Sequence, residues 1–417
     1  MRSIEIGVVV LAIALLGGGN VMAADAPAPQ TTQTAERMPQ ESNGYTRYEL
    51  LAPGSGKFRI IYDITAIRPG ATAFFNPIRK GSIASDETVL DRATGAKLSF
   101  SIVSGDAAKT GGLPDADTSY DYIRVQLARP VPPDGGEGRI RIEKTYEDAK
   151  SYYQNGNVIV FDRSLGIKRN SVILPQDYGL IDCNYPVQVE QEADGRIKVS
   201  FLNNTPGEAP LKLSARPMHL VSTPSSVRSR IEERAAQTRD IVYFLRQPET
   251  HTFDLYHDYT EERPGMSRYV NVVRTGSAAS NPSARNLDTG AQIPAQILKG
   301  DAITKAGISD PDLPAVTPQS EVVVFNYTPL KAGQSIRLRM SETYTDPGRY
   351  NLVGDELVFD RSFGRPANAV VLPAGWMLTN STIPAQISTM DDGRVRLDFI
   401  NARGDEIGVL ITARKVN

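Results

Sequence analysis

The chain contains very little of the chemistry that disulfide frameworks and metal centres need. Its 417 residues include one cysteine, three histidines and one tryptophan. The single Cys183 excludes an internal disulfide, so folding depends on a packed core. Histidines this scarce, with no His-Glu-x-x-His sequence, argue against a zinc hydrolase, and we predict neither a metal nor another cofactor.

An excess of charge of one sign is absent, and long apolar runs are absent beyond the N-terminus. The formal net charge is −2, so no broad field attracts the protein to nucleic acid, and no nucleic-acid partner is predicted. Residues 6–16 form an apolar run that follows Arg2 and precedes Val21-Met22-Ala23. Such a run is too short to span a bilayer and is typical of a signal peptide.

These features predict an exported protein. We expect residues 1–23 to be a signal peptide cleaved after Ala23, and the mature protein to lie in the periplasm or to be secreted, with no transmembrane segment after cleavage. A retained N-terminal anchor is the alternative, which the short apolar run disfavours. Residues 24–44 carry few apolar side chains and predict a disordered leader.

An internal repeat organises the rest of the chain. Phe161-Asp162-Arg163-Ser164 returns as Phe359-Asp360-Arg361-Ser362, and this shift of 359 − 161 = 198 holds over residues 142–203. Nearer the N-terminus the shift is 265 − 70 = 195, so a three-residue difference is expected in loop 110–118. The unit is as large as a domain, which predicts two tandem copies, residues 45–217 and 241–416.

Each copy has the pattern of β-strands. Residues 196–201 alternate polar and apolar side chains, and residues 394–399 repeat the alternation. Asp194-Gly195 and Asp392-Gly393 precede these strands, where a hairpin needs residues with positive φ. The fold class predicted is therefore all-β, with two tandem, duplicated antiparallel β-sandwich-like domains.

Two further elements are expected. Asn155-Gly156 predicts a hairpin between strands at 139–146 and 157–162. Apolar residues every four positions, after a Thr-Pro-Ser-Ser cap, predict a helix over about 224–239. This helix would form the connector between the copies, residues 218–240.

The duplication helps to separate fold residues from site residues, because a feature present in both copies is most economically structural. Asp162-Arg163 and Asp360-Arg361 recur at a strand end. One interpretation is an anion site built on the guanidinium, but an ion pair that clamps the fold is favoured. Residues 79–82 and 274–277 are likewise favoured as plain loops over anion-binding nests.

Two histidines occur in the second copy alone. His251 and His257 lie near Asp254 and Asp258, which suggests metal ligands. On one strand the two imidazoles would share a face but lie ~20 Å apart, too far to bind one ion. A pair of sheet-surface histidines is therefore favoured over a zinc site.

No catalytic residue is predicted. Cys183 is replaced by Ser381 in the second copy, which favours a small strand residue over a nucleophile. His219 lies at the end of the first copy without a Gly-x-Ser-x-Gly elbow, although a scattered Ser/His/Asp triad stays open. Four aromatic residues are candidates for a sugar platform, with core or rim positions favoured: Tyr152, Tyr153, Tyr178 and Trp376.

One phrase carries a resemblance to a known family. Asn-x-Val-x-Leu-Pro, followed by an aromatic residue and a proline-led strand, occurs over residues 170–186 and 368–384. It resembles the non-catalytic all-β domain of gluzincin metallopeptidases. The resemblance implies a β scaffold for packing or binding, and no peptidase activity, because the catalytic domain and zinc motif are absent. The whole pattern is also similar to exported tandem β-domain proteins of Gram-negative bacteria.

Three classes of function fit these observations. A non-enzymatic interaction or scaffold protein of the cell envelope is favoured, whose partner would be another envelope protein, a peptide or a glycan. The alternative is a peptide- or glycan-binding module that uses a cleft between two like domains. A hydrolase with scattered catalytic residues comes third. Binding residues are left open.

Overall fold

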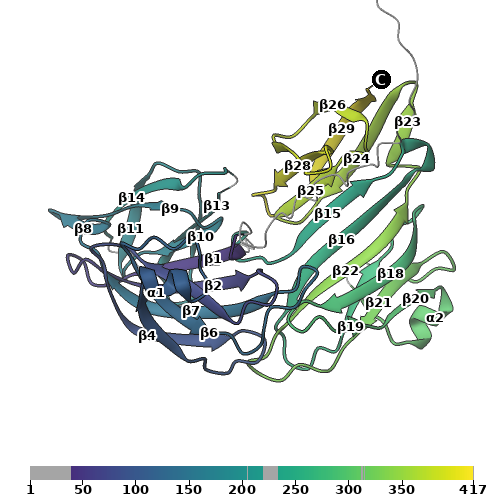
Figure 1. The fold of residues 1–417 in the computed structure, drawn as a ribbon. Coiled ribbons are helices and arrows are strands. Elements are labelled where there is room, and N and C mark those ends of the chain that lie inside the picture. The colour runs from purple at the N-terminus through teal and green to yellow at the C-terminus, as the bar shows by residue number, and fades with distance from the viewer. Residues whose placement is uncertain (1–38, 204, 219–232, 311–312, 314, 417) are drawn as a thin grey trace, which may run out of the picture. The chain divides into compact units, whose positions relative to one another are not determined.

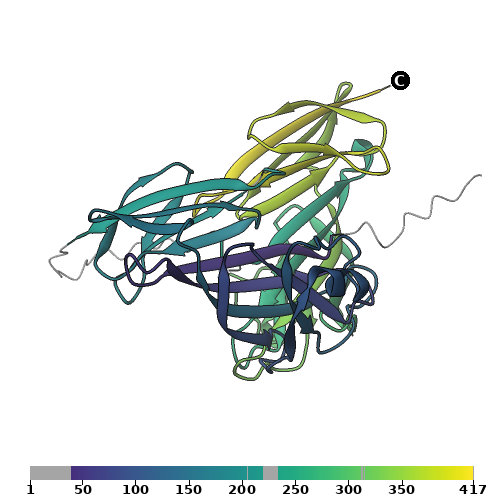
Figure 2. The ribbon, with the colours of Figure 1, turned by 60° about the vertical axis from the view of Figure 1, so that its left-hand side comes forward.

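The computed structural model describes residues 39–203, 205–218, 233–310, 313 and 315–416. It is 54% strand and 4% helix, which confirms the all-β prediction. In Figures 1 and 2 the first copy runs from purple to teal and the second from green to yellow. No helix within these ranges has the length and apolar character needed to cross a bilayer.

Three sheets build the first copy, with the orders β12-β13-β10-β1-β2-β7-β4, β11-β14-β9-β8 and β3-β6-β5. The elements are β1 Glu41–Leu50, β2 Lys57–Ala66, β3 Ala73–Ile78, β4 Ile83–Asp91, β5 Phe100–Ser104, α1 Gly105–Thr110, β6 Asp121–Gln126, β7 Gly138–Glu147, β8 Tyr152–Asn155, β9 Val158–Leu165, β10 Arg169–Ile173, β11 Tyr178–Cys183, β12 Gln188–Gln191, β13 Ile197–Leu202 and β14 Ala209–Pro217.

The second copy also has three sheets, with the orders β19-β18-β22-β16-β15-β25-β28-β27, β23-β24-β29-β26 and β17-β21-β20. The elements are β15 Asp240–Leu245, η2 Pro248–Thr250, β16 Thr252–Glu261, β17 Arg268–Val272, β18 Ala278–Asn286, β19 Gln292–Ile293, β20 Ala295–Lys299, α2 Asp301–Lys305, β21 Glu321–Asn326, β22 Ile336–Thr345, β23 Tyr350–Val353, β24 Glu356–Phe363, β25 Ala367–Val371, β26 Trp376–Ser381, β27 Gln386–Thr389, β28 Val395–Ile400 and β29 Ile407–Lys415.

The two copies have the same strand order. The large sheet reads β4-β7-β2-β1-β10-β13-β12 in the first copy and β18-β22-β16-β15-β25-β28-β27 in the second, where β19 adds a short edge strand. The smaller sheets correspond in the same way. Pairing is antiparallel except where β1 meets β10 and β15 meets β25 in parallel. The duplicated sheet fold is thus confirmed, with one parallel pair in each large sheet.

The three-residue difference between the copies is the net result of two changes. The β5–β6 connection is residues 105–120, whereas the β20–β21 connection is residues 300–320, or 21 residues against 16. The β6–β7 connection is residues 127–137, whereas the β21–β22 connection is residues 327–335, or 9 against 11. A shift between identical residues detects only the sum of such changes, so the expected single difference was incomplete.

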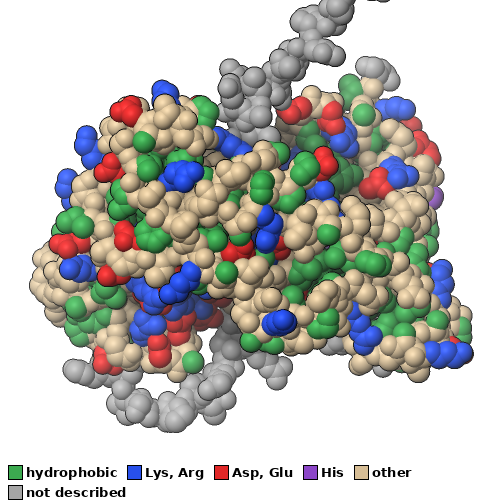
Figure 3. All heavy atoms as spheres, turned by 60° about the horizontal axis from the view of Figure 1, so that its bottom comes forward, with side chains coloured by type: hydrophobic (Ala, Val, Ile, Leu, Met, Phe, Trp, Pro, Cys, Tyr) green, Lys and Arg blue, Asp and Glu red, His purple; other side chains and the backbone are tan. Residues whose placement is uncertain are grey.

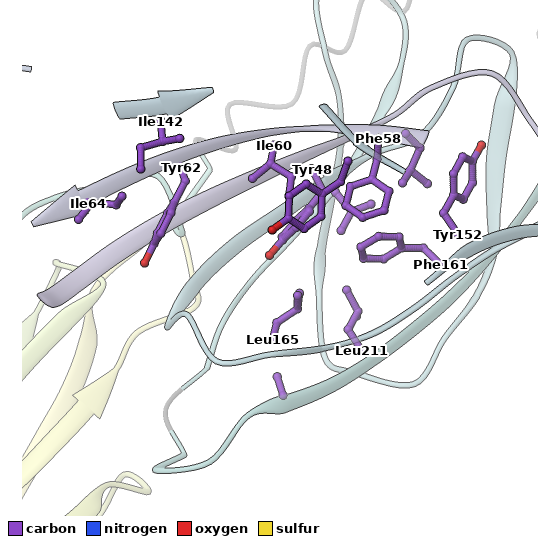
Figure 4. Packing of buried hydrophobic residues seen from close by; sticks show 14 of the residues in the cluster. Tyr48, Phe58, Ile60, Tyr62, Ile64, Ile142, Tyr152, Phe161, Leu165 and Leu211 are labelled. Carbon is purple, nitrogen blue, oxygen red and sulfur yellow. The ribbon is translucent and has the colours of Figure 1, made fainter. Parts of the chain in front are cut away.

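Aromatic side chains fill the space between the large sheet and the four-stranded sheet in each copy. Phe58 on β2 meets Phe161 on β9 with ring centroids 5.5 Å apart, and Phe253 and Phe359 repeat the contact at 5.7 Å. Figure 4 shows Tyr48 and Phe58 facing Phe161 across the first core. Because all four phenylalanines are fully buried, each contributes roughly 1.5–3 kcal/mol from burial.

The hairpin at Gly156 joins β8 to β9 and not residues 139–146 to 157–162. β7 belongs to the large sheet and ends before Asp148. The Asp148 carboxylate accepts hydrogen bonds from the Ser151 hydroxyl (2.7 Å) and the Ser151 N–H (3.2 Å). This capped turn carries the chain into the four-stranded sheet, so an extra short strand intervenes before the Gly156 turn.

The helices also differ from expectation. α1 and α2 occupy equivalent connections, and the Ser104 hydroxyl caps α1 by accepting from the Ala107 N–H at 3.3 Å. Of the expected helix, residues 224–232 lie outside the described residues, and residues 233–239 contain a turn at 234–236 and no helix. Residues 1–38 lie outside as well, and β1 begins at Glu41, before the expected end of the leader.

Candidate functional site

The two copies pack on each other through equivalent connections, a region we call the seam. The Ser335 hydroxyl donates to the Arg92 carbonyl oxygen at 2.7 Å, and the Ser335 N–H donates to the Ala93 carbonyl oxygen at 3.2 Å. In the reciprocal direction, the Glu137 N–H donates to the Leu287 carbonyl oxygen at 2.8 Å. Reciprocal contacts of this kind are typical of an isologous dimer interface, here within one chain.

A buried ion pair occupies the seam. Arg139 donates from Nε and Nη2 to the two carboxylate oxygens of Asp288, at 2.6 and 2.8 Å, and both side chains are 3% exposed. Asp288 also accepts from the Arg337 N–H at 3.1 Å. Asp288 has Ala93 as its equivalent in the first copy, at the shift 288 − 93 = 195. The seam is therefore symmetric in its backbone contacts and asymmetric in this ion pair.

Three adjoining cavities follow the seam, with volumes of about 700, 480 and 250 Å³. The smallest shares Gln334 and Ser335 with the largest. It shares Arg92, Arg141 and Glu262 with the second. Neighbouring cavities have lining residues in common, so we treat the three together and call them the seam groove.

The largest cavity, the neutral arm, takes half of its lining from two segments of the second copy. These are residues 291–294, which include the edge strand β19, and residues 326–330, which begin at the last residue of β21. Arg129 and Asp288 are the charged residues among its described lining. Asp288 is paired with Arg139, and Arg129 Nη2 lies 3.6 Å from the Asp91 carboxylate. This arm offers amides, hydroxyls and backbone groups.

The second cavity, the arginine arm, has a different character. Its charged lining comprises Arg92, Arg141, Arg169, Arg239, Arg263 and Arg365 with Asp63, Glu261 and Glu262. Elsewhere charges of both signs intermix, as Figure 3 shows on one face. The excess of arginine over carboxylate in the described lining suits an anionic ligand.

Each carboxylate of the arginine arm is already bound by an arginine. Arg141 donates twice to Asp63, at 2.6 and 2.9 Å. Arg263 donates twice to Glu261, at 2.9 and 2.7 Å. Arg92 is hydrogen-bonded to Glu262.

Arg239 differs from these arginines. It makes no ion pair with a carboxylate in the described residues, and its guanidinium carbon lies 4.7 Å from the ring centroid of Tyr259 and 5.5 Å from that of Tyr269. A guanidinium held on aromatic faces keeps its N–H donors in one plane. Those donors are the clearest candidates to meet a ligand.

Most charged residues of the arginine arm have no charged equivalent in the other copy. Tyr45 pairs with Arg169 in the first copy and Asp240 pairs with Ala367 in the second, so Tyr45 is equivalent to Asp240 and Arg169 to Ala367. The same equivalence extends to the neighbouring positions. Arg92 then stands where the second copy has Leu287, and Glu261 stands where the first copy has Ala66. The other such pairs are Arg239 with Gly44, Glu262 with Ile67 and Arg365 with Ile167. The arm is thus a departure from the duplicated pattern.

The positive charge of the arginine arm and its surroundings lowers the pKa of neighbouring groups. Burial lowers the pKa of His257 to about 3, and Arg239 and Arg365 lower it further. Burial also lowers the pKa of Arg92, with Asp63 opposing the effect and Arg139 adding to it. His257 is therefore neutral across the physiological range.

The Asp-Arg pairs do not pair within themselves. Arg163 bonds Asp148 at 3.0 Å and Arg361 bonds Asp346 at 3.0 Å, each as a largely buried clamp. The neighbouring Asp162 is exposed and lies 2.9 Å from Lys212. Successive strand residues point to opposite faces, so Asp and Arg cannot share one. The structural interpretation of the arginines is supported, whereas a clamping role for Asp162 and its equivalent Asp360, which is also exposed, is wrong.

The histidines are not both on a strand. His251 precedes β16 with φ 53°, and its Nδ1 lies 2.9 Å from the Tyr350 carbonyl oxygen. His257 is on β16, buried beside Tyr269. Asp258 points the other way and binds Arg339 twice, while Asp254 binds Arg246. No group of three or more His, Cys, Asp or Glu side chains able to hold a metal occurs in the described ranges.

The remaining candidates have structural partners. Ser82 and Ser277 donate their N–H groups to Arg79 and Arg274 carbonyls and so close the two loops. The Cys183 thiol contacts the Tyr185 carbonyl oxygen at 3.5 Å, and Ser381 bonds the equivalent carbonyl.

The aromatic candidates do not form a platform. Tyr152 and Trp376 are buried, and Tyr153 and Tyr178 are half-buried. The Trp376 indole N–H donates to the Gln247 side chain at 3.0 Å. His219 lies outside the described residues.

The groove residues were missed because the comparison of the two copies covered only a few motifs and did not include these charged positions. A signal existed in the sequence: Arg92, Glu261 and Arg365 each have an apolar residue at the equivalent position of the other copy. A comparison of every equivalent position in the two copies identifies these three residues as differences. Their convergence on one cavity depends on how the copies pack, which alternation within strands does not encode.

Comparison with known proteins shows a weak structural likeness. An M1 zinc metallopeptidase from Deinococcus radiodurans is 13% identical, with a TM-score of 0.28, over 42% of this chain and 41% of that chain. An aminopeptidase N family protein from Idiomarina loihiensis is 9% identical, with a TM-score of 0.26, over 42% and 29%. This chain thus spans less than half the length of either. No family model and no curated protein matches.

Proposed function

We propose that this chain is a non-enzymatic interaction protein of the cell envelope that holds an extended ligand, a peptide or glycan of an envelope component, in the seam groove. The observation that carries the proposal is the series of three cavities, with shared lining residues, along the contact between the two copies. Pockets between like domains are preferred ligand sites. Export rests on the apolar run at residues 6–16 and the small residues before Ala24.

Binding is favoured over catalysis by the state of the polar groups in the groove. The carboxylates of the arginine arm are engaged by arginines, whereas a general acid or base must be free to exchange a proton. The groups that remain available are donors, amides and strand edges, which hold ligands.

The test is capture from envelope extract by the full mature chain, compared with two tryptophan variants. Gln292→Trp fills the neutral arm, and Gln296→Trp places the same ring on an exposed position of β20 outside the groove lining. We expect Gln292→Trp to lose the captured component at least about tenfold, and Gln296→Trp to retain it. Equal capture by both variants contradicts the groove as the binding surface.

Export has its own test. Mass spectrometry of the protein purified from its own cells is expected to show a mature N-terminus at Ala24. An intact Met1 on protein recovered only with membranes contradicts that part of the proposal.

A further inference from the structure

We propose that the arginine arm binds a carboxylate of an acidic peptide that lies extended along the seam groove, an inference that rests on the proposed function. The arm lies beside the neutral arm through shared lining residues, so one extended chain can reach both. Arginine is the side chain best suited to planar, bidentate recognition of a carboxylate.

Charge supports an anionic occupant. Even without Arg169 and Arg365, four arginines face three carboxylates in the described lining. The three carboxylates are neutralised by Arg92, Arg141 and Arg263. Arg239 is the guanidinium that remains without a carboxylate in the described residues, and it is half-buried beside two tyrosine rings.

A peptide fits the neighbouring arm better than a glycan. β19 is an edge strand of the large sheet and lines the neutral arm, so its open side can accept main-chain hydrogen bonds from an extended peptide. Sugars often stack on aromatic rings, but each tyrosine in the described lining of the arginine arm already has an arginine near its ring. Arg239 covers Tyr259, and Arg169 lies 6.0 Å from the ring of Tyr45.

The probe is a fluorescein-labelled ten-residue peptide of alternating Glu and Thr, with a Gln and Thr peptide as its neutral counterpart. Fluorescence anisotropy with the mature chain is expected to give at least about tenfold tighter binding of the Glu peptide. Arg239→Gln should remove most of this preference. Arg216→Gln, which deletes an exposed charge on β14 outside the groove, should leave it unchanged. Arg239→Lys retains the charge and should keep part of the preference.

Three outcomes overturn the inference: equal binding of the two peptides, a preference that survives Arg239→Gln, or tighter binding of an oligogalacturonate, which would assign the arm to an acidic glycan. Melting curves of each variant separate lost binding from lost folding. If Gln292→Trp abolishes envelope capture while neither peptide binds, the proposed function stands and this inference fails. If the Glu peptide binds but capture is insensitive to Gln292→Trp, the proposed function fails instead.

Discussion

The two copies place opposite ionisable groups at one buried position. Lys144 in the first copy and Glu342 in the second occupy the same register on β7 and β22, at 342 − 144 = 198, and both are buried. Lys144 Nζ donates to the Asn76 side-chain oxygen. In the second copy the Asn271 amide donates to Glu342 at 2.7 Å.

The difference shows what the fold requires at this position and what it leaves free. An asparagine side chain carries both an acceptor and a donor, so the equivalent Asn76 and Asn271 can serve a lysine or a glutamate by turning the amide over. Burial lowers the pKa of Lys144 to about 7 and raises that of Glu342 to about 7. The fold therefore specifies a buried polar contact without specifying its sign.

The seam shows a second kind of divergence. The core pair Phe58–Phe161 is preserved as Phe253–Phe359, because core volume cannot change in one copy without cost. Arg139 and Asp288, by contrast, form an ion pair without a counterpart, because the residue equivalent to Asp288 in the first copy is Ala93. The aromatic core is thus the same in the two copies, whereas this ion pair of the seam is present on one side only.

The largest effect is expected from Asp288→Ala. It leaves the Arg139 guanidinium buried without its carboxylate, which should lower the free energy of unfolding by about 3–5 kcal/mol. Urea denaturation measures the loss. Asp360→Ala, at an exposed aspartate, is the control and should change stability by less than about 0.5 kcal/mol.

A double variant sharpens the interpretation. Arg139→Met with Asp288→Leu removes both charges, so most of the loss should be recovered if it arises from an unpaired buried charge. A loss below about 1 kcal/mol for Asp288→Ala alone would show that the ion pair does not hold the seam.

The clamps should behave alike in the two copies. Asp148→Ala and Asp346→Ala each unpair a largely buried arginine, Arg163 or Arg361, and each should cost about 1–3 kcal/mol in urea denaturation. Asp162→Ala should cost less than about 0.5 kcal/mol, because its contact with Lys212 is exposed. A larger effect from Asp162 than from Asp148 would restore the view that the Asp-Arg dipeptide is the clamp.

The buried residues Glu342 and Lys144 should make stability depend on pH in opposite directions, and these effects should be smaller. The folded-state pKa of Glu342 is raised, so stability should fall as pH rises from about 4.5 to about 7. The folded-state pKa of Lys144 is lowered, so its penalty is fully present below about 7 and should disappear as pH rises toward about 10.5. Glu342→Gln should flatten the first slope and Lys144→Met the second, and each slope is at most about 1.4 kcal/mol per pH unit for a single group.

Urea midpoints of the wild type and both variants, measured from pH 4.5 to pH 10, test these slopes. The result that contradicts the account is a slope of the same sign from both residues. Unchanged profiles in both variants would likewise show that neither group titrates at a cost to the fold.

The sequence predicted the duplicated sheets because identity at a fixed shift and alternation within strands are local signals. Val395, Leu397 and Phe399 alternate in burial as predicted. The hairpin at Gly156 was assigned the wrong partner, since the turn capped by Asp148 changes sheets and strand pattern does not report sheet identity.

The candidate site could not be predicted from the residue pattern of each strand taken alone. The arginine arm joins Arg92 of one copy to Arg239 and Glu262 of the other, and their proximity depends on how the copies pack. Comparing the copies residue by residue, with Arg92 against Leu287, marks such positions but does not bring them together.

Site-specific photocrosslinking in the producing cells tests the central claim most directly. A photoreactive phenylalanine at Thr328, an exposed residue in the neutral arm, should give a discrete adduct that the same group at Gln296 does not give. Adding Arg239→Gln should weaken the Thr328 adduct, because the ligand spans both arms. No adduct at Thr328, or equal adducts at Thr328 and Gln296, would contradict a binding groove between the repeats.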